Sequence, residues 1–175
     1  MSYQAYLDAQ IAKTSKMPPL LQPRLPRLIG KVAQLVDVRG LSVLCVGCRN
    51  HWELDLFRDL GAKPVGIDLA KLAPDVIVMD MHALTFTEPF DVVFSCHSLE
   101  HAYDVPKALG EWARVTKPGG VWVIEVPIRY QTTAVDRHDF GSLDGLREVL
   151  KPYVQSEMWA TEKPGVARWI GRVLD

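Results

Sequence analysis

The chain has 175 residues, of which 48% are hydrophobic and 23% are charged, and its formal net charge is −1 at pH 7. This length supports one domain with a substantial hydrophobic core and is short for two. The near balance of charge gives no reason to expect binding to nucleic acid, and no apolar run is long enough to span a bilayer.

The beginning of the chain and its cysteines bear on location. The first six residues, MSYQAY, lack the basic and apolar stretches of a signal peptide. The three cysteines are an odd number, which favours a reducing compartment. We therefore expect a soluble, cytoplasmic protein without membrane association.

The first elements expected are two helices. Apolar side chains recur at helical spacing over residues 3–16 and again over 28–36, where the pattern ends near Gly40. A proline-rich link over 17–26 separates the two patterns. The first helix either covers a pocket as a lid or packs against the flank of the sheet, and the pattern is compatible with both.

Beyond residue 40, short runs rich in valine and isoleucine alternate with helical patterns over 52–60 and 105–116. Runs that are apolar on both faces and separated by helices indicate a doubly wound, mostly parallel sheet, and therefore an α/β fold. The expected strands of this part are 42–46, 64–69, 76–79, 91–95 and 121–126.

The C-terminal part predicts a helix followed by two strands. The helix is expected over 143–150, with Ser142 as its N-cap. The strands are expected over 154–161 and 166–174, joined by the turn Lys163-Pro164-Gly165. Such a short connection suits an antiparallel pair.

Polar residues and glycines follow the predicted strands, at the edge where ligands of such sheets bind. Gly47 follows the first strand, and Asp68 follows the second, about twenty residues further on, where a carboxylate suits both hydroxyls of an adenosine ribose. Asp80 follows the third strand, and the segment SCHSLEH (95–101) follows the fourth. The segment KPGG (117–120) is expected to form a tight turn before the fifth. Each feature alone is also typical of an ordinary cap or turn, and it is their order and spacing together that is specific.

At these residues the chain resembles the class I S-adenosylmethionine-dependent methyltransferases, and within them the small-molecule branch often called type 11. The resemblance is carried by VLCVGC, PVGIDL, VMDMHAL and the long stretch FDVVFSCHSLEHAYDVPKALGEWARVTKPGGVWVIEVP. It implies a Rossmann-like fold with a seven-stranded sheet whose last strand is antiparallel. The whole chain, 1–175, is then one domain, with N-terminal helices in 1–40, a cofactor-binding core in 41–127, and a substrate-side cap, helix and hairpin in 128–175.

The resemblance also implies roles for individual residues. Gly47 would lie under the methionine part of S-adenosylmethionine, Asp68 would bind the ribose hydroxyls, and Asp80 would bind the adenine amino group. Met81 or His82 would add a main-chain contact to the adenine. The cofactor-binding residues expected on this basis are Gly47, Cys48, Arg49, Asp68, Leu69, Asp80, Met81, His82 and Ser95.

The loop after the first strand departs from the family pattern. The family usually has an acidic residue in place of Cys45 and glycines in place of Arg49 and His51. Because S-adenosylmethionine carries a carboxylate and no diphosphate, it has less need of an all-glycine cradle. Arg49 either pairs with that carboxylate or faces solvent. Cys45 and Cys48 are expected to pack rather than bind zinc or act as a redox pair, and Cys96 is expected near Cys45, with a disulfide as an alternative.

Histidines are the expected catalytic bases, because their pKa lies near neutral pH. His97 is expected near the transferred methyl group, and His138 in the segment that caps the substrate pocket. Glu100 and His101 are expected mainly to hold loops together. Residues near His138 that would orient a polar substrate are Arg129, Tyr130 and Asp136. No metal site is expected.

Three functions are compatible with these features. The first is a methyltransferase that acts on a small molecule by in-line displacement. The second is a catalytically silent, methyltransferase-like binding or partner protein, which the replaced glycines and Cys45 motivate. The third is a nicotinamide-dependent oxidoreductase, against which the missing Gly-x-Gly-x-x-Gly motif argues.

Overall fold

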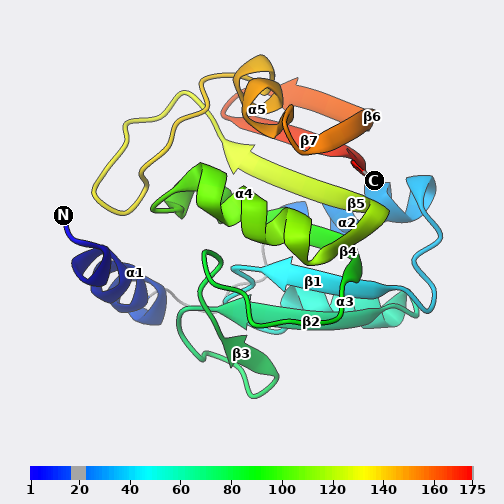
Figure 1. Cartoon of the computed structure of the whole chain (residues 1–175), viewed down its shortest axis with the longest axis horizontal. Helices are drawn as coiled ribbons and strands as arrows, with labels where there is room; N and C mark the ends of the chain where they lie inside the picture. The colour runs from blue at the N-terminus through cyan, green and yellow to red at the C-terminus, as the bar shows by residue number, and fades with distance from the viewer. Residues whose placement is uncertain (17–22, 175) are drawn as a thin grey trace.

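The centre of the molecule is one seven-stranded sheet with the strand order β3-β2-β1-β4-β5-β7-β6 (Figure 1). The computed structural model describes residues 1–16 and 23–174. Strands β1 to β5 pair in parallel, whereas β7 runs antiparallel to both β5 and β6. This confirms the predicted α/β fold. The strands are β1 (Ser42–Val46), β2 (Lys63–Asp68), β3 (Val76–Val78), β4 (Phe90–Cys96), β5 (Thr116–Pro127), β6 (Val154–Lys163) and β7 (Val166–Val173).

Helices cover both faces of the sheet, with α4 in front of it and α2 and α3 behind it in Figure 1. Alternate side chains of each strand supply the two cores. On β1, Leu44 and Val46 face the core shared with α4 and α5, and Val43 and Cys45 face the core shared with α2 and α3. The helices are α1 (Tyr3–Lys16), α2 (Arg24–Leu35), α3 (Trp52–Asp59), η1 (Leu99–His101, a 3-10 turn), α4 (Val105–Arg114) and α5 (Leu143–Leu150).

The helix starts follow local sequence. Asp104 caps α4 by accepting a hydrogen bond from the backbone N–H of Lys107 at 2.9 Å. Ser142 caps α5 by accepting from the N–H of Gly145 at 3.1 Å, as the sequence predicts. Pro26 lies in the first turn of α2, where its missing N–H leaves no hydrogen bond unmade.

Two predictions about the borders of elements were wrong. The segment KPGG is not a turn before β5 but lies inside it, where the pairing with β4 passes from Phe90↔Thr116 to Val92↔Val121. The strand therefore bulges at these residues, and Gly119 adopts a φ of +67°. In the proline-rich link, residues 24–26 already belong to α2, while 17–22 lie outside the described residues.

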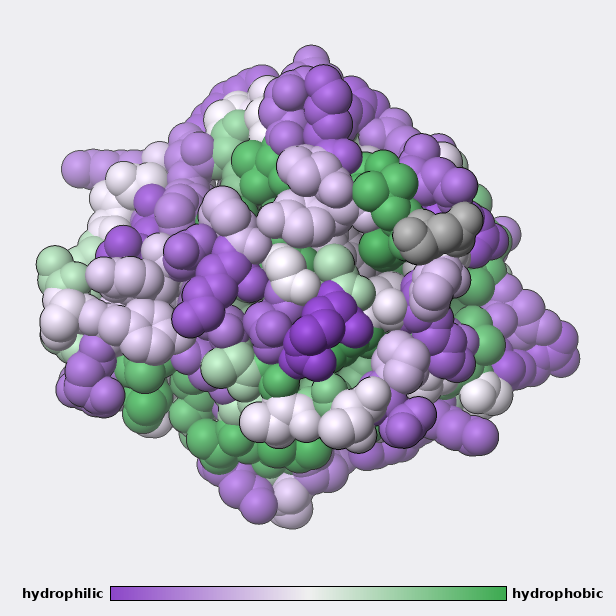
Figure 2. Space-filling view, viewed as in Figure 1, coloured by the Kyte–Doolittle hydropathy of each residue, from purple (hydrophilic) through white to green (hydrophobic). Residues whose placement is uncertain are grey.

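The carboxyl ends of β1, β2 and β5 point toward the side of the molecule on which α1 and the 128–142 segment lie (Figure 1). Hydrophilic side chains cover most of the face in Figure 2, and hydrophobic ones gather in smaller groups. The hydrophobic layers therefore lie inside the molecule. In sheets of this type, ligands bind at the edge formed by the carboxyl ends of the strands.

Candidate cofactor and active site

A cavity of about 350 Å³ opens at the carboxyl ends of β1, β2 and β4. Its walls come from the loop after β1, the ends of β2 and β3, the segment after β4, and side chains of α1 and α2. The expected cofactor residues that line it are Gly47, Cys48, Arg49, Asp68, Leu69, Asp80 and Met81. Segments far apart in the sequence thus meet where the strand order predicts a binding site.

Gly47 can only be a glycine in this structure. Its φ is +69°, and a Cβ added to it would lie 2.4 Å from the Cβ of Ser98. Ser98 belongs to the segment after β4 and donates a hydrogen bond from Oγ to the carbonyl of Val46 at 2.8 Å. The loop is also tied to β2, because the N–H groups of Gly47 and Cys48 both donate to the carbonyl of Ile67.

Arg49 keeps the backbone shape of the glycine that it replaces. Its φ is +57°, in the left-handed region, and its N–H donates to Oδ2 of Asp68 at 2.9 Å. Its side chain is partly buried and lines the cavity. His51, the second replacement, is half-exposed and lies 3.7 Å from Asp55. The loop conformation therefore survives both substitutions.

Asp68 is held at the end of β2 by main-chain donors. Oδ2 accepts from Arg49, and Oδ1 accepts from the N–H of Ala70 at 3.2 Å. The side chain is almost fully buried, and this burial raises its pKa above the usual value. A fixed carboxylate at the floor of the cavity results.

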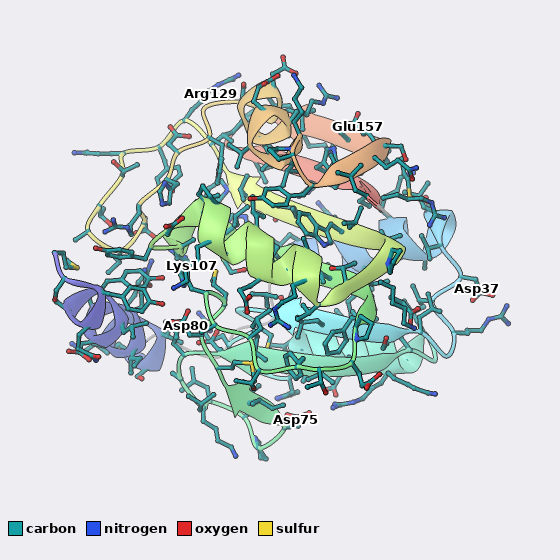
Figure 3. All side chains as sticks on the ribbon, in the orientation of Figure 1. Asp37, Asp75, Asp80, Lys107, Arg129 and Glu157 are labelled. Carbon is teal, nitrogen blue, oxygen red and sulfur yellow. The ribbon has the colours of Figure 1, made fainter. Side chains whose placement is uncertain are left out.

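Asp80 connects the end of β3 to the N-terminal helix (Figure 3). Its Oδ2 accepts a hydrogen bond from the hydroxyl of Tyr3, and its Oδ1 accepts from the backbone N–H and Nδ1 of His82 at 2.9 and 2.7 Å. Burial disfavours the charged form, but the hydrogen bonds from His82 and Tyr3 outweigh it and lower the pKa of Asp80.

His82 is a positioning residue for Asp80 and does not line the cavity. Its Nε2 accepts hydrogen bonds from the N–H groups of Tyr103 and Asp104 at 3.0 and 3.3 Å, which assigns the ring hydrogen to Nδ1. The ring is buried and bridges the loop after β3 to the start of α4. Met81 supplies the lining at this point.

His97 lies in the cavity directly after β4 and contacts a buried carboxylate of β5. Its Nε2 is 3.1 Å from Oε1 of Glu125, and its N–H donates to the Glu125 carbonyl at 2.8 Å. Its φ of +55° is strained for a residue with a side chain. Burial opposes ionisation of Glu125, but hydrogen bonds from His97 and Arg168 outweigh it and lower the pKa. The pair has the form of a base with its orienting acid.

Glu100 and His101 follow on the same segment. They hold the 128–142 segment in place and also line the cavity. The carbonyl of Glu100 accepts from the N–H groups of Arg137 and His138, and His101 Nδ1 contacts the carbonyl of Val135 at 3.1 Å, so both hold the 128–142 segment. Both side chains also line the cavity. Burial raises the pKa of Glu100 to about 8 and lowers that of His101 to about 4.

The structure separates His138 from His97. His138 donates from Nε2 to the carbonyl of Ala102 at 2.8 Å and lines a second, wider cavity of about 990 Å³ beside α4 and α5. Ser95 is fully buried below the first cavity, with its Oγ 2.7 Å from that of Ser98. Of the three residues expected to orient a substrate, Tyr130 and Asp136 line the first cavity, and Arg129 does not.

Known proteins of similar sequence and fold are methyltransferases. Residues 44–124 match a protein family described as "Methyltransferase domain". Over this segment the chain is similar to S-adenosylmethionine-dependent methyltransferases.

One relative of this chain is a ubiquinone biosynthesis O-methyltransferase of Rhodopseudomonas palustris. It is 33% identical over 99 residues, which are 49% of this chain and 39% of the relative. The chain therefore spans well under half of the length of that relative.

Two solved structures share the fold. A Burkholderia thailandensis 1,6-didemethyltoxoflavin N1-methyltransferase with bound S-adenosylhomocysteine has a TM-score of 0.69 at 15% identity, covering 98% of this chain and 85% of that one. An S-adenosylmethionine-dependent methyltransferase of Aquifex aeolicus has a TM-score of 0.69 at 17% identity, covering 93% and 98%. The cofactor of the family is S-adenosylmethionine.

The cavity has polar groups whose hydrogen bonding is incomplete. Three buried polar atoms of residues that line it, Oε2 of Glu53, Oε2 of Glu100 and Nε of Arg24, make no hydrogen bond within the described chain, although Nε of Arg24 lies 3.6 Å from Oε1 of Glu125 as an ion pair. An amino acid linked to adenosine offers donors and acceptors that complement them. The residues present therefore fit S-adenosylmethionine.

Several of these residues were missed by sequence reasoning. Arg24, Glu53 and Glu125 belong to helices and a strand in which a charged residue is normally taken to face solvent. For Glu125 a signal existed, since it interrupts the apolar run VWVIEV of a buried strand. Of the lining side chains of α1, Tyr6 belongs to the helical pattern predicted as a possible lid, whereas Gln10, Lys13 and Thr14 had no such signal.

The described residues show no metal cluster, no membrane-spanning helix and no disulfide. Within residues 1–16 and 23–174, no group of three or more histidine, cysteine, aspartate or glutamate side chains could hold a metal ion. None of the helices described is long and apolar enough to cross a membrane. All three cysteines are buried and free, so Cys45 and Cys96 form no disulfide.

Proposed function

We propose that the protein is an active methyltransferase that transfers a methyl group from S-adenosylmethionine to a small-molecule acceptor. The observation that carries this proposal is the single cavity that joins the Gly47 loop and Asp68 to the His97–Glu125 pair. Its volume of about 350 Å³ suits small ligands. One similar protein is named for ubiquinone biosynthesis, and another is named for 1,6-didemethyltoxoflavin and binds it. Both names support a small acceptor here.

The residues divide into two groups by their place in the cavity. Arg49, Asp68 and Asp80, with Gly47, Cys48, Leu69 and Met81, are proposed to hold the cofactor at the ends of β1 to β3. Asp68 binds the ribose hydroxyls, and Asp80 the adenine amino group. When bound, the cofactor supplies an activated methyl group.

His97 is proposed to take the proton of the acceptor. With its Nε2 hydrogen on Glu125, Nδ1 carries the lone pair that accepts this proton, and the charge of Glu125 stabilises the imidazolium that forms. Tyr130 and Asp136 orient the acceptor from the 128–142 segment. Helix α1, through Tyr6 and Gln10, excludes water from the reacting groups.

The proposal places the protein in the cytoplasm, without nucleic-acid or membrane partners. The three free thiols support a reducing compartment. The near-neutral net charge of −1 supports the absence of nucleic-acid binding.

Calorimetric titration of the full chain with S-adenosylmethionine, S-adenosylhomocysteine and NAD tests this function. We expect micromolar binding of the first two and none of NAD. Binding of none would favour the silent partner protein, and binding of NAD alone would favour an oxidoreductase. The left-handed φ of Arg49 supports the active protein over the silent alternative, because the loop conformation does not require the replaced glycine.

A further inference from the structure

Glu53 is a buried carboxylate with an unmet acceptor at the wall of the cofactor cavity. It lies in the first turn of α3, its exposed fraction is 4%, and it lines the cavity beside the Gly47 loop. Its Oε2 is buried and accepts no hydrogen bond from residues 1–16 or 23–174. Buried acceptors are nearly always satisfied, so one that remains open at a cavity wall indicates a ligand with a donor.

The groups that face Glu53 come from four elements. Burial and the charge of Asp68 at the end of β2 disfavour its ionised form, whereas Arg24 of α2 and Arg49 of the loop favour it. Two neutral thiols, Cys45 of β1 and Cys48 of the loop, lie within the influence of its charge. The balance raises the pKa of Glu53 to about 8, so that it holds a proton at pH 7 in the free protein.

The position of Glu53 relates to the departure at Cys45. Where the family usually has an acidic residue, this chain has a cysteine that is fully buried, packs in the core between the sheet and helices α2 and α3, and does not line the cavity. Burial and, after it, the ionised form of Glu53 raise the pKa of this thiol. A carboxylate from α3 therefore lies beside the place where strand β1 lacks one.

We propose that Glu53 binds the α-ammonium group of S-adenosylmethionine, and so supplies from helix α3 the negative charge that β1 lacks at Cys45. This inference rests on the proposed function, because it requires the cofactor in this cavity. An ammonium offers three donors and a full positive charge, and it can donate to the carboxylate oxygen of Glu53 that has no hydrogen bond. The first turn of a helix adds a favourable field for the ionised carboxylate.

Cofactor binding is then coupled to a proton. A cation next to Glu53 favours its charged form, so the pKa of Glu53 falls on binding and the proton is released to solvent. At pH 7 the free protein holds most of this proton, because its pKa is about 8. Binding of the amino-acid group should therefore release close to one proton.

The test compares two ligands by calorimetry on the full chain. S-adenosylhomocysteine carries the amino-acid group, and 5′-methylthioadenosine keeps the adenosine and the thioether but lacks it. In Glu53→Gln, which keeps the shape and removes the charge, we expect the Kd for S-adenosylhomocysteine to rise about 10- to 100-fold. The Kd for 5′-methylthioadenosine should stay within about twofold.

Asp59→Asn, at the exposed end of the same helix, is the matched control and should change neither affinity. Titrations in buffers of different ionisation enthalpy should show proton release in the wild type and none in Glu53→Gln. Thermal unfolding confirms that each variant folds.

Unchanged affinity of Glu53→Gln for S-adenosylhomocysteine overturns the inference. An equal loss of both ligands also overturns it, since Glu53 would then shape the adenosine site instead. If the wild-type protein binds neither ligand, the proposed function itself is contradicted. This outcome differs from those that overturn only the inference about Glu53.

Discussion

Single residues carry the conformation of the cofactor loop. Gly47 needs both a positive φ and the absence of a Cβ, because Ser98 fills the space beside it. Arg49 needs only the positive φ, which its backbone adopts and which the hydrogen bond to Asp68 holds in place. This is why one of the family's glycines is kept in this loop while another is replaced.

Gly47→Ala should lower the free energy of unfolding more than Gly40→Ala does. Both glycines have a positive φ, +69° and +76°, which costs an alanine about 1–2 kcal/mol. At Gly47 the overlap with Ser98 adds about 1–3 kcal/mol, whereas a Cβ at Gly40 meets nothing within 4 Å. Denaturant unfolding of both variants measures the difference, and equal losses would contradict the role of Ser98.

Substitution by alanine can show which of the two candidate bases, His97 or His138, takes part in the reaction. His97→Ala should lower kcat about 10²- to 10⁴-fold for an acceptor found by screening phenols and amines, because it removes the base beside Glu125. The Kd for S-adenosylhomocysteine should change little. His138→Ala, which alters a residue bonded to Ala102 outside the cavity, serves as the control. A larger loss in His138→Ala would show that the base was wrongly chosen.

At the scale of elements, α1 is fastened to the site that it covers. Tyr3 donates to Asp80, Gln10 donates to the carbonyl of Val135, and Lys13 pairs with Asp136 at 2.5 Å. Two of these contacts reach the 128–142 segment, and the first reaches the proposed adenine site. The N-terminal helix thus joins the proposed cofactor end of the cavity to its proposed acceptor end, and its role as a lid stays a prediction.

Tyr3→Phe should loosen α1 without unfolding the domain. The substitution removes the hydroxyl that donates to the half-buried Asp80, a charge-assisted hydrogen bond worth about 1.5–3 kcal/mol. Amide hydrogen exchange in α1 should become about 10-fold faster or more, while the sheet is unaffected. Tyr153→Phe, whose hydroxyl bonds to Pro106 on another face, should leave α1 unchanged. Equal exchange of α1 in both variants would contradict this fastening.

At the scale of the whole molecule, burial around the cavity shifts the pKa of ionisable side chains and so makes the stability of the protein depend on pH. Glu53 and Glu100 both have a pKa of about 8 in the folded protein, against 4.5 for an ordinary glutamate. Between these values the folded state holds protons that the unfolded state has lost. The free energy of unfolding contributed by these groups therefore falls as pH rises from about 4.5 to 8.

His101 acts in the opposite direction. Its pKa of about 4 in the folded state lies below the ordinary 6.5, so the unfolded chain takes up a proton first as pH falls. This contribution to stability is lost between pH 6.5 and about 4. The two effects together favour a stability maximum on the acidic side of neutrality.

The double variant Glu53→Gln/Glu100→Gln should flatten the alkaline side of this profile. Its stability relative to the wild type should increase steadily from pH 5 to pH 8, because the wild type alone must ionise buried carboxylates. Thermal unfolding across that range measures the difference. A constant difference between the two proteins would mean that neither glutamate is protonated in the folded state.

Much of the fold can be predicted from local sequence patterns, namely side-chain periodicity, caps and turn residues. The strand β1 and the helices α1 and α5 have the borders that periodicity predicts, and the cap Ser142 was read from its residue type. The seven-stranded sheet and its antiparallel β7 followed from the resemblance and the short Lys163–Gly165 turn, whereas the strand order came from the structure. These features depend on side-chain period and turn chemistry, which a sequence displays directly.

The acceptor end of the cavity depended on contacts that no local pattern records. Glu125 meets His97 because β4 and β5 are neighbours, and Glu53 faces the cavity because α3 turns that side inward. The same packing moves His138 to a second cavity and buries Ser95 and His82 beneath the first. By itself, the sequence determined the sheet and which residues gather at its strand ends, where the cofactor is proposed to bind, since these follow strand ends along the chain. Only the tertiary structure decided which buried charges meet there, because burial and pairing arise between segments that are distant in sequence.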